Sequence, residues 1–415
     1  MFADSRVWLG DEHAASIDAK RPWDLRCRYT DTILNRIATN SPFISCSLPV
    51  GRSKQNAGPW ATGLLPEGSH LQALAARAKA PTNYTADLLG RYGRDIAGAY
   101  TITAGEPPEP RRWALERYTA GELAADLRNS ATEPGFAIRD DSELLLAGLQ
   151  NKLLVVRTGP NEWARPINGH PSTHIMKLDD PKRPGLTAAE HACLLIAKAV
   201  GLTTVNAEMI DVDGLAILVV DRYDRTVNDD GTLRRIHQED ACQALGTNLD
   251  AGRGRGKYQT AGGPSYAEIA ELVRAHSARS KDELAELLRL AAFTSIIGNA
   301  DGHGKNISFL IDTERGTITL APAYDTVPTA LWPELRNTQA MSVAGKFSVA
   351  ASFDDLVTEG ASWGLTRAEA SDTVEQLAGA VADAVADLGH REDLVNLVAG
   401  RATDLLRDSK LNPCS

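Results

Sequence analysis

The segment from residue 281 to residue 325 constrains the fold of this chain more than any other. Its first part, KDELAELLRLAAFTSIIG, repeats apolar residues at intervals of three and four, which is the pattern of an amphipathic helix. A polar loop, NADGHGKN, follows. Two short apolar runs, ISFLI and TITLA, then predict a pair of strands joined by DTERG. The segment therefore predicts a helix, a polar loop and a hairpin, with Asp325 directly after the hairpin.

The loop carries four polar side chains that a simple turn does not require: Asp301, His303, Lys305 and Asn306. The Asp-x-x-x-x-Asn spacing is that of a kinase catalytic loop, where the Asp handles the substrate hydroxyl proton and the Asn binds Mg²⁺. Mg²⁺ prefers oxygen ligands and completes its shell with nucleotide phosphates, so Asp325 is a candidate second ligand. The alternative is an Asp-Gly turn followed by an Asn that caps the next strand. The surrounding elements favour phosphoryl transfer.

Two segments upstream offer groups that could bind nucleotide phosphates. Lys177 stands at the end of a predicted strand, THIMKL, where it is either a phosphate-binding cation or a solubilising charge on an edge strand. Gly148, Gln150 and Lys152 lie between two apolar runs in LLLAGLQNKLLVV, which suits a hairpin over phosphates. We assign all four of these upstream residues to nucleotide binding. His303 and Lys305 of the polar loop are assigned to nucleotide binding as well.

A third segment, LAILVVDRYDR, is a predicted buried strand that ends in charged residues. A nucleotide-binding hinge would place Asp221, Tyr223 and Asp224 beside the base and ribose, with Asp224 on the ribose; a salt-bridged strand exit explains the same residues equally well. The helix predicted in LTAAEHACLLIAKAVGL begins with Thr187 and Glu190 in the spacing of a capping box. Glu190 could instead form an ion pair with Lys177.

Composition narrows the classes of protein. The chain has 415 residues, a net charge of -10 and 43% hydrophobic residues. An acidic chain is a poor candidate for direct nucleic-acid binding through bulk charge. No apolar run is long enough for a membrane span, and the N-terminus lacks a secretory signal, so a cytoplasmic location is expected. The five scattered cysteines predict neither a disulfide framework nor a metal site.

The order of predicted elements indicates an α+β, protein-kinase-like fold of two lobes, mixed α/β and then mostly helical. GEPPEPRRW reads as a linker, ALERYTAGELAADLRN as a helix, and SCSLPVG as a short strand. The predicted boundaries are an N-terminal subdomain over 1–105, a linker and helix over 106–134, an N-lobe over 135–230 and a helical C-lobe over 231–415.

With these pieces in order, the chain resembles the HipA family of bacterial serine/threonine kinase toxins. The resemblance is clear from about residue 140 to 330, and LLPEG and GRYGRDIAGA resemble the family's N-terminal subdomain. The matching segments are AGLQNK, STHIMKL, AEHACLLIAKAVGL, VVDRYDR, HQEDACQALG, KYQTAGGPSY, NADGHGKN and APAYDTVPTA.

The resemblance implies roles and partners. Asp301 would be the catalytic base, Asn306 and Asp325 would hold Mg²⁺, Lys177 would contact ATP and Asp224 would lie at the ribose. Family members phosphorylate a serine in a protein, in known members an aminoacyl-tRNA synthetase. They are neutralised by a small HipB-like helix-turn-helix antitoxin, through which any contact with DNA would be indirect.

One position departs from the family. Leu145 stands where members typically carry a serine whose autophosphorylation ejects the phosphate loop, so self-inactivation by that route should be absent. The glycine-rich basic segment 250–259 is either a solvated connection or a contact for tRNA or an acidic target. Two other functions remain open: a kinase-fold scaffold or co-repressor acting with its antitoxin, and a small-molecule kinase. HQEDACQALG and GGPSY weigh against the latter.

Overall fold

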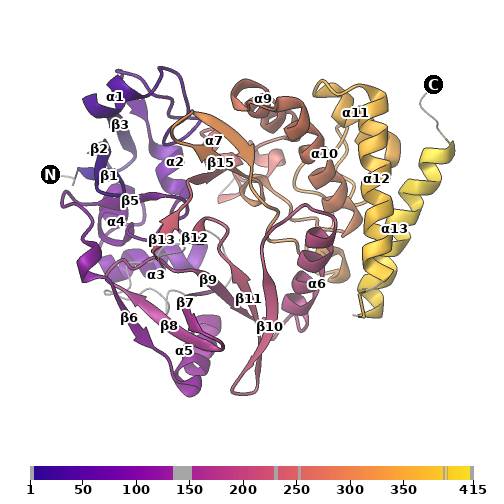
Figure 1. The fold of residues 1–415 in the computed structure, drawn as a ribbon, viewed down its shortest axis with the longest axis horizontal. Helices are drawn as coiled ribbons and strands as arrows, with labels where there is room; N and C mark the ends of the chain where they lie inside the picture. The colour runs from indigo at the N-terminus through magenta and orange to yellow at the C-terminus, as the bar shows by residue number, and fades with distance from the viewer. Residues whose placement is uncertain are drawn as a thin grey trace. The chain divides into compact units, whose positions relative to one another are not determined.

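The computed structural model describes residues 4–133, 152–228, 232–250, 254–386, 388–389 and 391–411 (Figure 1). The chain forms two compact units, and neither is one continuous segment. The first unit comprises Met1–Asp180, Glu208–Glu239 and Leu310–Thr317, and the second comprises Pro181–Ala207, Asp240–Phe309 and Ile318–Ser415. Within the described part of the chain, no helix combines the length and the apolar character that crossing a membrane requires.

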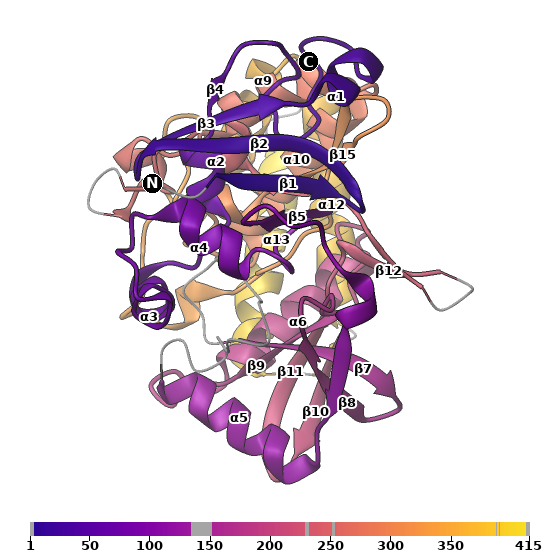
Figure 2. The same ribbon diagram turned by 90° about the vertical axis from the view of Figure 1, so that its left-hand side faces the viewer.

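The N-terminal part of the first unit is built on a five-stranded sheet of order β4-β3-β2-β1-β5. Each neighbouring pair is antiparallel, and Figure 2 shows four of the strands side by side. The strands are β1 (Ser5–Leu9), β2 (Glu12–Arg21), β3 (Asp24–Tyr29), β4 (Gln55–Asn56) and β5 (Tyr100–Thr103). The helices with them are α1 (Asp31–Arg36), α2 (Gly58–Gly63), α3 (Gly68–Ala78) and α4 (Thr85–Tyr92).

This sheet and its helices enclose one hydrophobic core. Val7 and Ile17 of the sheet and Leu88 of α4 are fully buried in it, because alternate residues of a strand point to the same face. The stretch SCSLPVG, predicted to be a strand, contributes only an isolated bridge between Ser45 and Leu48. That prediction was wrong, since a short apolar run can be buried as a turn as well as a strand.

A second sheet in the first unit has six strands in the order β10-β11-β9-β7-β8-β6. The strands are β6 (Ala114–Arg117), β7 (Leu153–Gly159), β8 (Glu162–Ile167), β9 (His174–Leu178), β10 (Ala207–Val212) and β11 (Leu215–Asp221). Helix α5 (Ala120–Thr132) packs on this sheet, with Leu123 and Leu127 against Val155, Met176 and Val219. The strands predicted in THIMKL and LAILVV are confirmed as β9 and β11.

The helix predicted from residue 114 begins later than expected. Residues 114–117 pair with β8 as a strand, and α5 starts after Thr119, which forms a capping box with Glu122. Pairing with a distant strand overrides local helix propensity here, and the capping box supplies the start signal.

The other described strands form two small sheets. One pairs β12 (Arg225–Val227) with β13 (Leu233–Arg235), and the other has three strands in the order β14-β15-β16. The latter are β14 (Gln238–Asp240), β15 (Ser308–Asp312) and β16 (Thr317–Leu320). The strand pair predicted after the polar loop is therefore confirmed.

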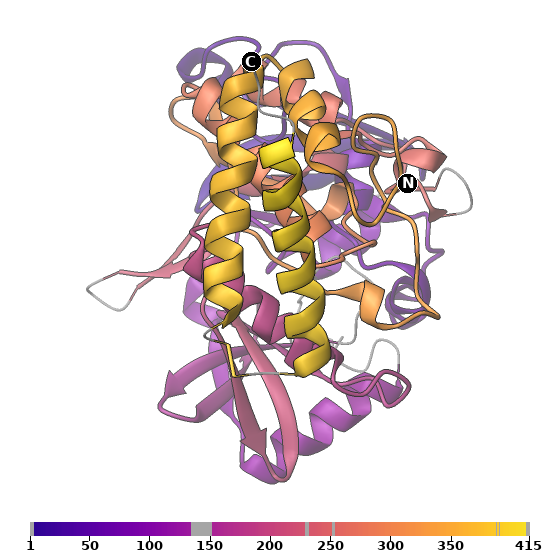
Figure 3. The ribbon, with the colours of Figure 1, turned by 90° about the vertical axis from the view of Figure 1, so that its right-hand side faces the viewer.

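The second unit is mostly helical, and its long helices α12 and α13 run side by side (Figure 3). The helices are α6 (Leu186–Ala199), α7 (Ala241–Ala244), α9 (Tyr266–His276), α10 (Ser280–Ile296), α11 (Phe353–Ser362), α12 (Arg367–Ala386) and α13 (Glu392–Leu411). Short 3-10 turns are η1 (Pro110–Arg112) in the first unit and η2 (Gln259–Ala261), η3 (Gly304–Asn306) and η4 (Thr329–Leu331) in the second.

The capping box predicted at Thr187 and Glu190 is wrong. Helix α6 begins one residue before Thr187, and its N-cap is Gly185, which has a φ of 84° and no side chain to cap with. Thr187 and Glu190 are both buried inside the helix. A glycine in the left-handed region sets the chain direction here, and the sequence spacing alone could not reveal that.

Candidate active site

The polar loop follows the C-terminal end of α10, a helix with many buried residues. Helix α10 buries Leu284, Leu287, Leu288 and Phe293, so its C-terminal end is fixed in the core. Gly298, with a φ of 73°, ends the helix in the left-handed conformation that glycine adopts without strain. The loop therefore leaves a rigid support.

Asn299 ties the loop to the segment after the hairpin. Its Oδ1 accepts a hydrogen bond from the backbone N–H of Asp301 at 3.0 Å. Its Nδ2 donates to the backbone carbonyl of Asp325 at 3.4 Å. Asn299 is buried, so these bonds are shielded from water. The sequence reasoning gave Asn299 no role, although it is the first residue of the NADGHGKN motif.

Asn306 and Asp325 are in direct contact. Asn306 Nδ2 donates to Asp325 Oδ2 at 3.2 Å, and Asn306 Oδ1 is buried with no hydrogen-bond partner among the described residues. Asp325 has a φ of 56°, a left-handed conformation uncommon for a residue with a side chain. Such strain is typical of functional positions. The structure thus brings together the three residues on which the sequence prediction depended: Asp301, Asn306 and Asp325.

These atoms fit a hard divalent cation. The available donors are carboxylate oxygens of Asp325 and the unpaired amide oxygen of Asn306, and oxygen ligands are those that Mg²⁺ prefers. Among the described residues, no group of three or more His, Cys, Asp or Glu side chains could hold a metal ion. A site with two protein ligands therefore suits an ion that takes its other ligands from phosphates and water.

Asp301 lies in a mixed electrostatic environment. Burial raises the pKa of its carboxyl, and the hydrogen bond from Tyr258 and the charge of Lys257 lower it. Asp325 raises the pKa and Arg336 lowers it, both more weakly. The Tyr258 hydroxyl donates to Asp301 Oδ1 at 2.9 Å. Tyr258 is a contact that the sequence reasoning missed, since it interpreted residues 250–259 either as a solvated connection or as a contact for tRNA or an acidic target.

His303 and Lys305 are both buried, and their surroundings differ. Burial, reinforced by Lys257, holds the pKa of His303 well below its usual range, so the ring is neutral. Its Nδ1 has no hydrogen-bond partner among the described residues. The ammonium of Lys305 lies 3.5 Å from Asp240, the N-cap of α7. The role of both residues in nucleotide binding stays a prediction.

Glycine is required where this loop meets α7. A Cβ at Gly304 would lie 2.5 Å from Pro264 Cγ and 2.9 Å from Cys242 Sγ. Real Cβ contacts are longer than this, so a side chain would push the loop away. The second glycine of the motif is therefore a packing requirement.

Apart from His303 and Lys305, the predicted nucleotide-binding residues belong to segments of the first unit. Lys177 is buried in β9, opposite Leu218 of β11, and β7 is the other neighbour of β9. The edge-strand alternative for Lys177 is therefore wrong, because β9 is an interior strand. Lys152 directly precedes β7. Gly148 and Gln150, together with Leu145, lie outside the described residues.

The charged strand exit proves to be a buried ion network. Asp224 accepts hydrogen bonds from Arg222 Nη2 and Arg225 Nη1, both at 2.8 Å, and from the N–H of Gly98 at 2.8 Å. Asp95 accepts from Arg225 Nη2 at 2.7 Å and from Ser172. These arginines hold the pKa of Asp224 below its usual range against the opposing effect of burial.

This network decides between the two interpretations of Asp224. Asp224 is 4% exposed and both of its carboxylate oxygens are occupied, so the ribose contact is not supported and the salt-bridged exit is. Asp221 lies beside His174 with Oδ1 and Nε2 3.1 Å apart, and the Tyr223 hydroxyl donates to Gln238 Oε1 at 3.0 Å. The roles of Asp221 and Tyr223 at a nucleotide stay predictions.

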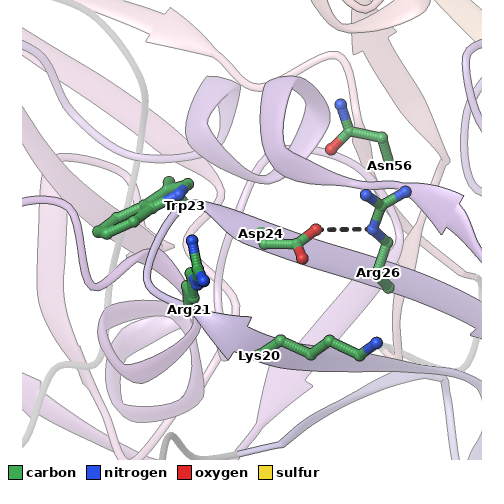
Figure 4. Close-up of a pocket in the computed structure, with 6 residues that line it drawn as sticks. All are labelled: Lys20, Arg21, Trp23, Asp24, Arg26 and Asn56. Atoms are coloured by element: carbon green, nitrogen blue, oxygen red, sulfur yellow. Dashed lines mark hydrogen bonds and ion pairs between the residues drawn. The ribbon is translucent and has the colours of Figure 1, made fainter.

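A surface cavity of about 400 Å³ lies beside the turn between β2 and β3. Figure 4 shows its lining side chains, with Arg26 paired to Asp24 and Trp23 at the turn. None of the residues predicted to bind nucleotide or metal lines it. It is separate from the candidate active site in its residues, and it carries no catalytic constellation.

Comparison with known proteins identifies the family. Residues 144–385 match the HipA-like C-terminal domain, and residues 5–103 match the HipA N-terminal domain. The chain belongs to the HipA family, as the sequence motifs predicted.

Among its relatives is a Sinorhizobium fredii protein, Y4mE, provisionally named a kinase, which is 34% identical over 97% of this chain and 92% of its own length. The serine/threonine-protein kinase toxin HipA of Shewanella oneidensis is 28% identical over 68% of this chain and 66% of its own length.

A solved structure shows the same fold. It is the Shewanella oneidensis MR-1 complex of HipA, HipB and operator DNA, with a TM-score of 0.79 and 23% identity, covering 98% of this chain and 97% of that one. The α+β, protein-kinase-like fold class predicted from the sequence is confirmed.

Proposed function

We propose that this protein is an ATP- and Mg²⁺-dependent serine/threonine protein kinase and the toxin of a toxin–antitoxin pair. One observation carries the proposal: Asp301 and Asp325 are tied to the same amide, Asn299, and Asp325 contacts Asn306. Proton handling and metal binding are the two functions that phosphoryl transfer needs from the protein at this point. Membership of a family that includes a named kinase toxin agrees with it.

Each residue has a distinct role in this proposal. Asp301 accepts or orients the proton of the substrate hydroxyl, and burial raises the pKa of its carboxyl, which makes the carboxylate a stronger base. Asn306 and Asp325 hold the metal through oxygen atoms. Lys177 contributes a cation for the phosphates of ATP. When bound, Mg²⁺ neutralises charge on the phosphates and helps to align them.

The direct test is phosphate transfer from labelled ATP to protein acceptors in a cell extract. Asp301→Asn and Asp325→Ala should abolish transfer, because positioning and electrostatic stabilisation supply most of the rate in this chemistry. Asp354→Asn serves as the matched control and should retain full transfer, because Asp354 is an exposed carboxylate of α11 paired with Arg367 of α12. Circular dichroism should show that all three variants fold.

Wild-type turnover in correctly folded Asp301→Asn would refute the catalytic assignment. A protein that binds its antitoxin but transfers no phosphate would instead support the scaffold or co-repressor alternative. Assays with small hydroxylated acceptors would expose a small-molecule kinase.

The partner proposal follows from the relatives. The solved structure that matches this fold is a complex of HipA with HipB and operator DNA. We infer that this chain binds a HipB-like helix-turn-helix antitoxin, reaches DNA only through it, and phosphorylates an aminoacyl-tRNA synthetase or a similar translation component. Expression alone should arrest growth, and co-expression of the helix-turn-helix protein encoded beside it should relieve the arrest. Arrest that Asp301→Asn also causes would contradict a kinase toxin.

We expect this protein not to switch itself off by phosphorylating its own phosphate loop, as members of the family typically do. Leucine has no hydroxyl, so Leu145 cannot accept phosphate. After incubation with ATP and Mg²⁺, mass spectrometry should find no phosphate in the peptide covering residues 142–158. Phosphate there would show that a neighbouring residue such as Ser142 replaces the usual serine.

A further inference from the structure

The C-terminal end of the glycine-rich basic segment 250–259 packs directly on the catalytic loop. The N–H of Gly304 donates to the carbonyl of Lys257 at 3.3 Å. A Cβ at Gly256 would lie 2.0 Å from the carbonyl oxygen of Asn248, so the backbone before Lys257 fits only with glycine. The segment is thus more than a solvated connection at this end, because its backbone is fixed against the residues around Asp301.

The ring of Tyr258 is held from several sides. The Arg336 guanidinium lies 4.7 Å from the ring centroid and the Lys257 ammonium 5.6 Å from it, both within cation–π range. The His303 ring meets Tyr258 edge to face at 5.3 Å. Arg336 is itself anchored by hydrogen bonds to the carbonyls of Thr338 and Gln339. Tyr258 therefore presents its hydroxyl from a fixed position.

That hydroxyl occupies one oxygen of the Asp301 carboxylate. It donates to Oδ1 at 2.9 Å, a normal length for a hydrogen bond to a carboxylate. A carboxylate with one oxygen held can turn much less freely, so the direction of Oδ2 is set as well. Asp301 is also anchored through its own N–H by Asn299. Backbone and side chain of the base are therefore fixed separately.

We propose that Tyr258 is a positioning residue for phosphoryl transfer, holding Asp301 Oδ1 so that Oδ2 faces the substrate hydroxyl. The inference rests on the proposed kinase function and names a residue outside the catalytic loop that completes its geometry. It also explains the KYQ motif, in which Lys257 supplies charge and a backbone acceptor and Tyr258 supplies the hydrogen bond.

The charges facing Asp301 determine the pH dependence of the effect. Lys257 and Arg336 favour its ionised form and Asp325 opposes it, while the Tyr258 hydrogen bond lowers the pKa and burial raises it. His303 is neutral and contributes no charge. Removing the Tyr258 hydroxyl leaves burial in place, so the pKa of Asp301 rises further. A general base works only when ionised, and the acidic limb of the activity profile should therefore move to higher pH.

The test compares Tyr258→Phe with Tyr118→Phe. Tyr118 donates to Asp126 Oδ2 at the same 2.9 Å, beside α5 and outside the proposed site, so it controls for loss of a tyrosine–carboxylate bond. Tyr258→Phe should lower kcat about 10-fold or more, as expected when a charged group loses a hydrogen bond, with KM for ATP unchanged. Its acidic limb should move to higher pH. Tyr118→Phe should keep the wild-type kcat and profile.

A second measurement is independent of activity. Carbon-13 NMR of protein labelled at the aspartate carboxyls reports the pKa of Asp301 directly, with the signal assigned by its absence in Asp301→Asn. The pKa should be higher in Tyr258→Phe than in the wild type and unchanged in Tyr118→Phe. Arg336→Met, which removes the cation over the ring, should move it in the same direction.

The outcomes separate the inference from the function. If Tyr258→Phe changes neither the pKa of Asp301 nor the acidic limb, the positioning role is overturned. If the pKa moves while the wild-type protein phosphorylates no acceptor, the contact acts as inferred and the kinase assignment fails.

Discussion

At the scale of single residues, the candidate site contains two residues held in an unfavourable state, one in its backbone conformation and one in the burial of its carboxylate. Asp325 holds a left-handed backbone, and Asp301 is a carboxylate whose pKa burial raises. Both features cost folding free energy and are retained where the chemistry requires them. The sequence predicted both residues from their spacing. It could not predict Asn299 or Tyr258 as their partners, because hydrogen bonds between distant segments leave no periodic signal.

The raised pKa of Asp301 has a consequence for stability. A carboxyl with a raised folded-state pKa contributes stability that is present below its unfolded pKa, about 4, and lost as pH rises through the folded value. Without Mg²⁺, the wild-type protein should therefore lose stability relative to Asp301→Asn as the pH rises above about 4. Thermal melting in EDTA across that range measures the difference. If the wild-type protein instead became more stable relative to Asp301→Asn as the pH rose, burial would not be the dominant effect on the pKa of Asp301.

Asn299 offers a second test at this scale. Asn299→Ala removes both the acceptor for the Asp301 N–H and the donor to the Asp325 carbonyl. Leaving these buried groups unpaired costs about 1–3 kcal/mol each at most, so the protein should fold with a lowered unfolding midpoint. Transfer should fall much more than stability, because Asp301 and Asp325 lose their common support. Stability lost without any loss of kcat would mean that Asn299 is only structural.

At the scale of elements, periodic segments were predictable and boundaries were not. Helices α6 and α10 and strands β9, β11, β15 and β16 all appear where apolar spacing placed them. One error arose where a distant partner decides the outcome, since residues 114–117 pair with β8. The other arose from a local backbone conformation, since the left-handed Gly185 rather than Thr187 caps α6. Strand order also depends on distant partners, so the sequence could not show that β9 is interior.

The interior position of Lys177 allows its charge to be tested apart from its packing. Lys177→Met keeps an unbranched apolar stem, whereas Lys177→Ala also removes packing in β9. Both should weaken ATP binding about 10-fold or more, the effect expected for a lost charge-assisted hydrogen bond to phosphate. Lys177→Ala should lower stability more than Lys177→Met, because only the alanine variant also loses that packing. Calorimetric titration with ATP gives the affinities, and Lys281→Ala, exposed on α10, is the control.

At the scale of the whole molecule, long-range ion pairs hold the first unit together. Asp95 is fully buried and contacts Arg225, which is 130 residues away in sequence. Arg222 and Arg225 also bind Asp224, and Arg235 lies 4.0 Å from Asp95. Two buried carboxylates are therefore stabilised by three guanidinium groups. No local pattern predicts such a network. The sequence left Asp224 with two interpretations for that reason.

Breaking this network should be costly. Asp95→Asn leaves Arg222 and Arg225 short of a charge partner, and removing one member of a buried pair costs about 3–5 kcal/mol. The arginines hold the pKa of Asp95 and Asp224 below the usual range. The stability that this network contributes should therefore be fully present above about pH 4 and be lost as pH falls below that value. Urea unfolding at several pH values should show a smaller acid dependence for Asp95→Asn; an equal dependence would place the acid sensitivity elsewhere.

The chain passes between its two units five times, after residues 180, 207, 239, 309 and 317. A single protease nick or a single recombination point therefore cannot release either unit as a whole, since each would lack segments that remain on the other fragment. Attempts to express the halves as separate polypeptides should yield insoluble material. Shuffling within the family should accordingly succeed only by exchange of nearly the entire reading frame.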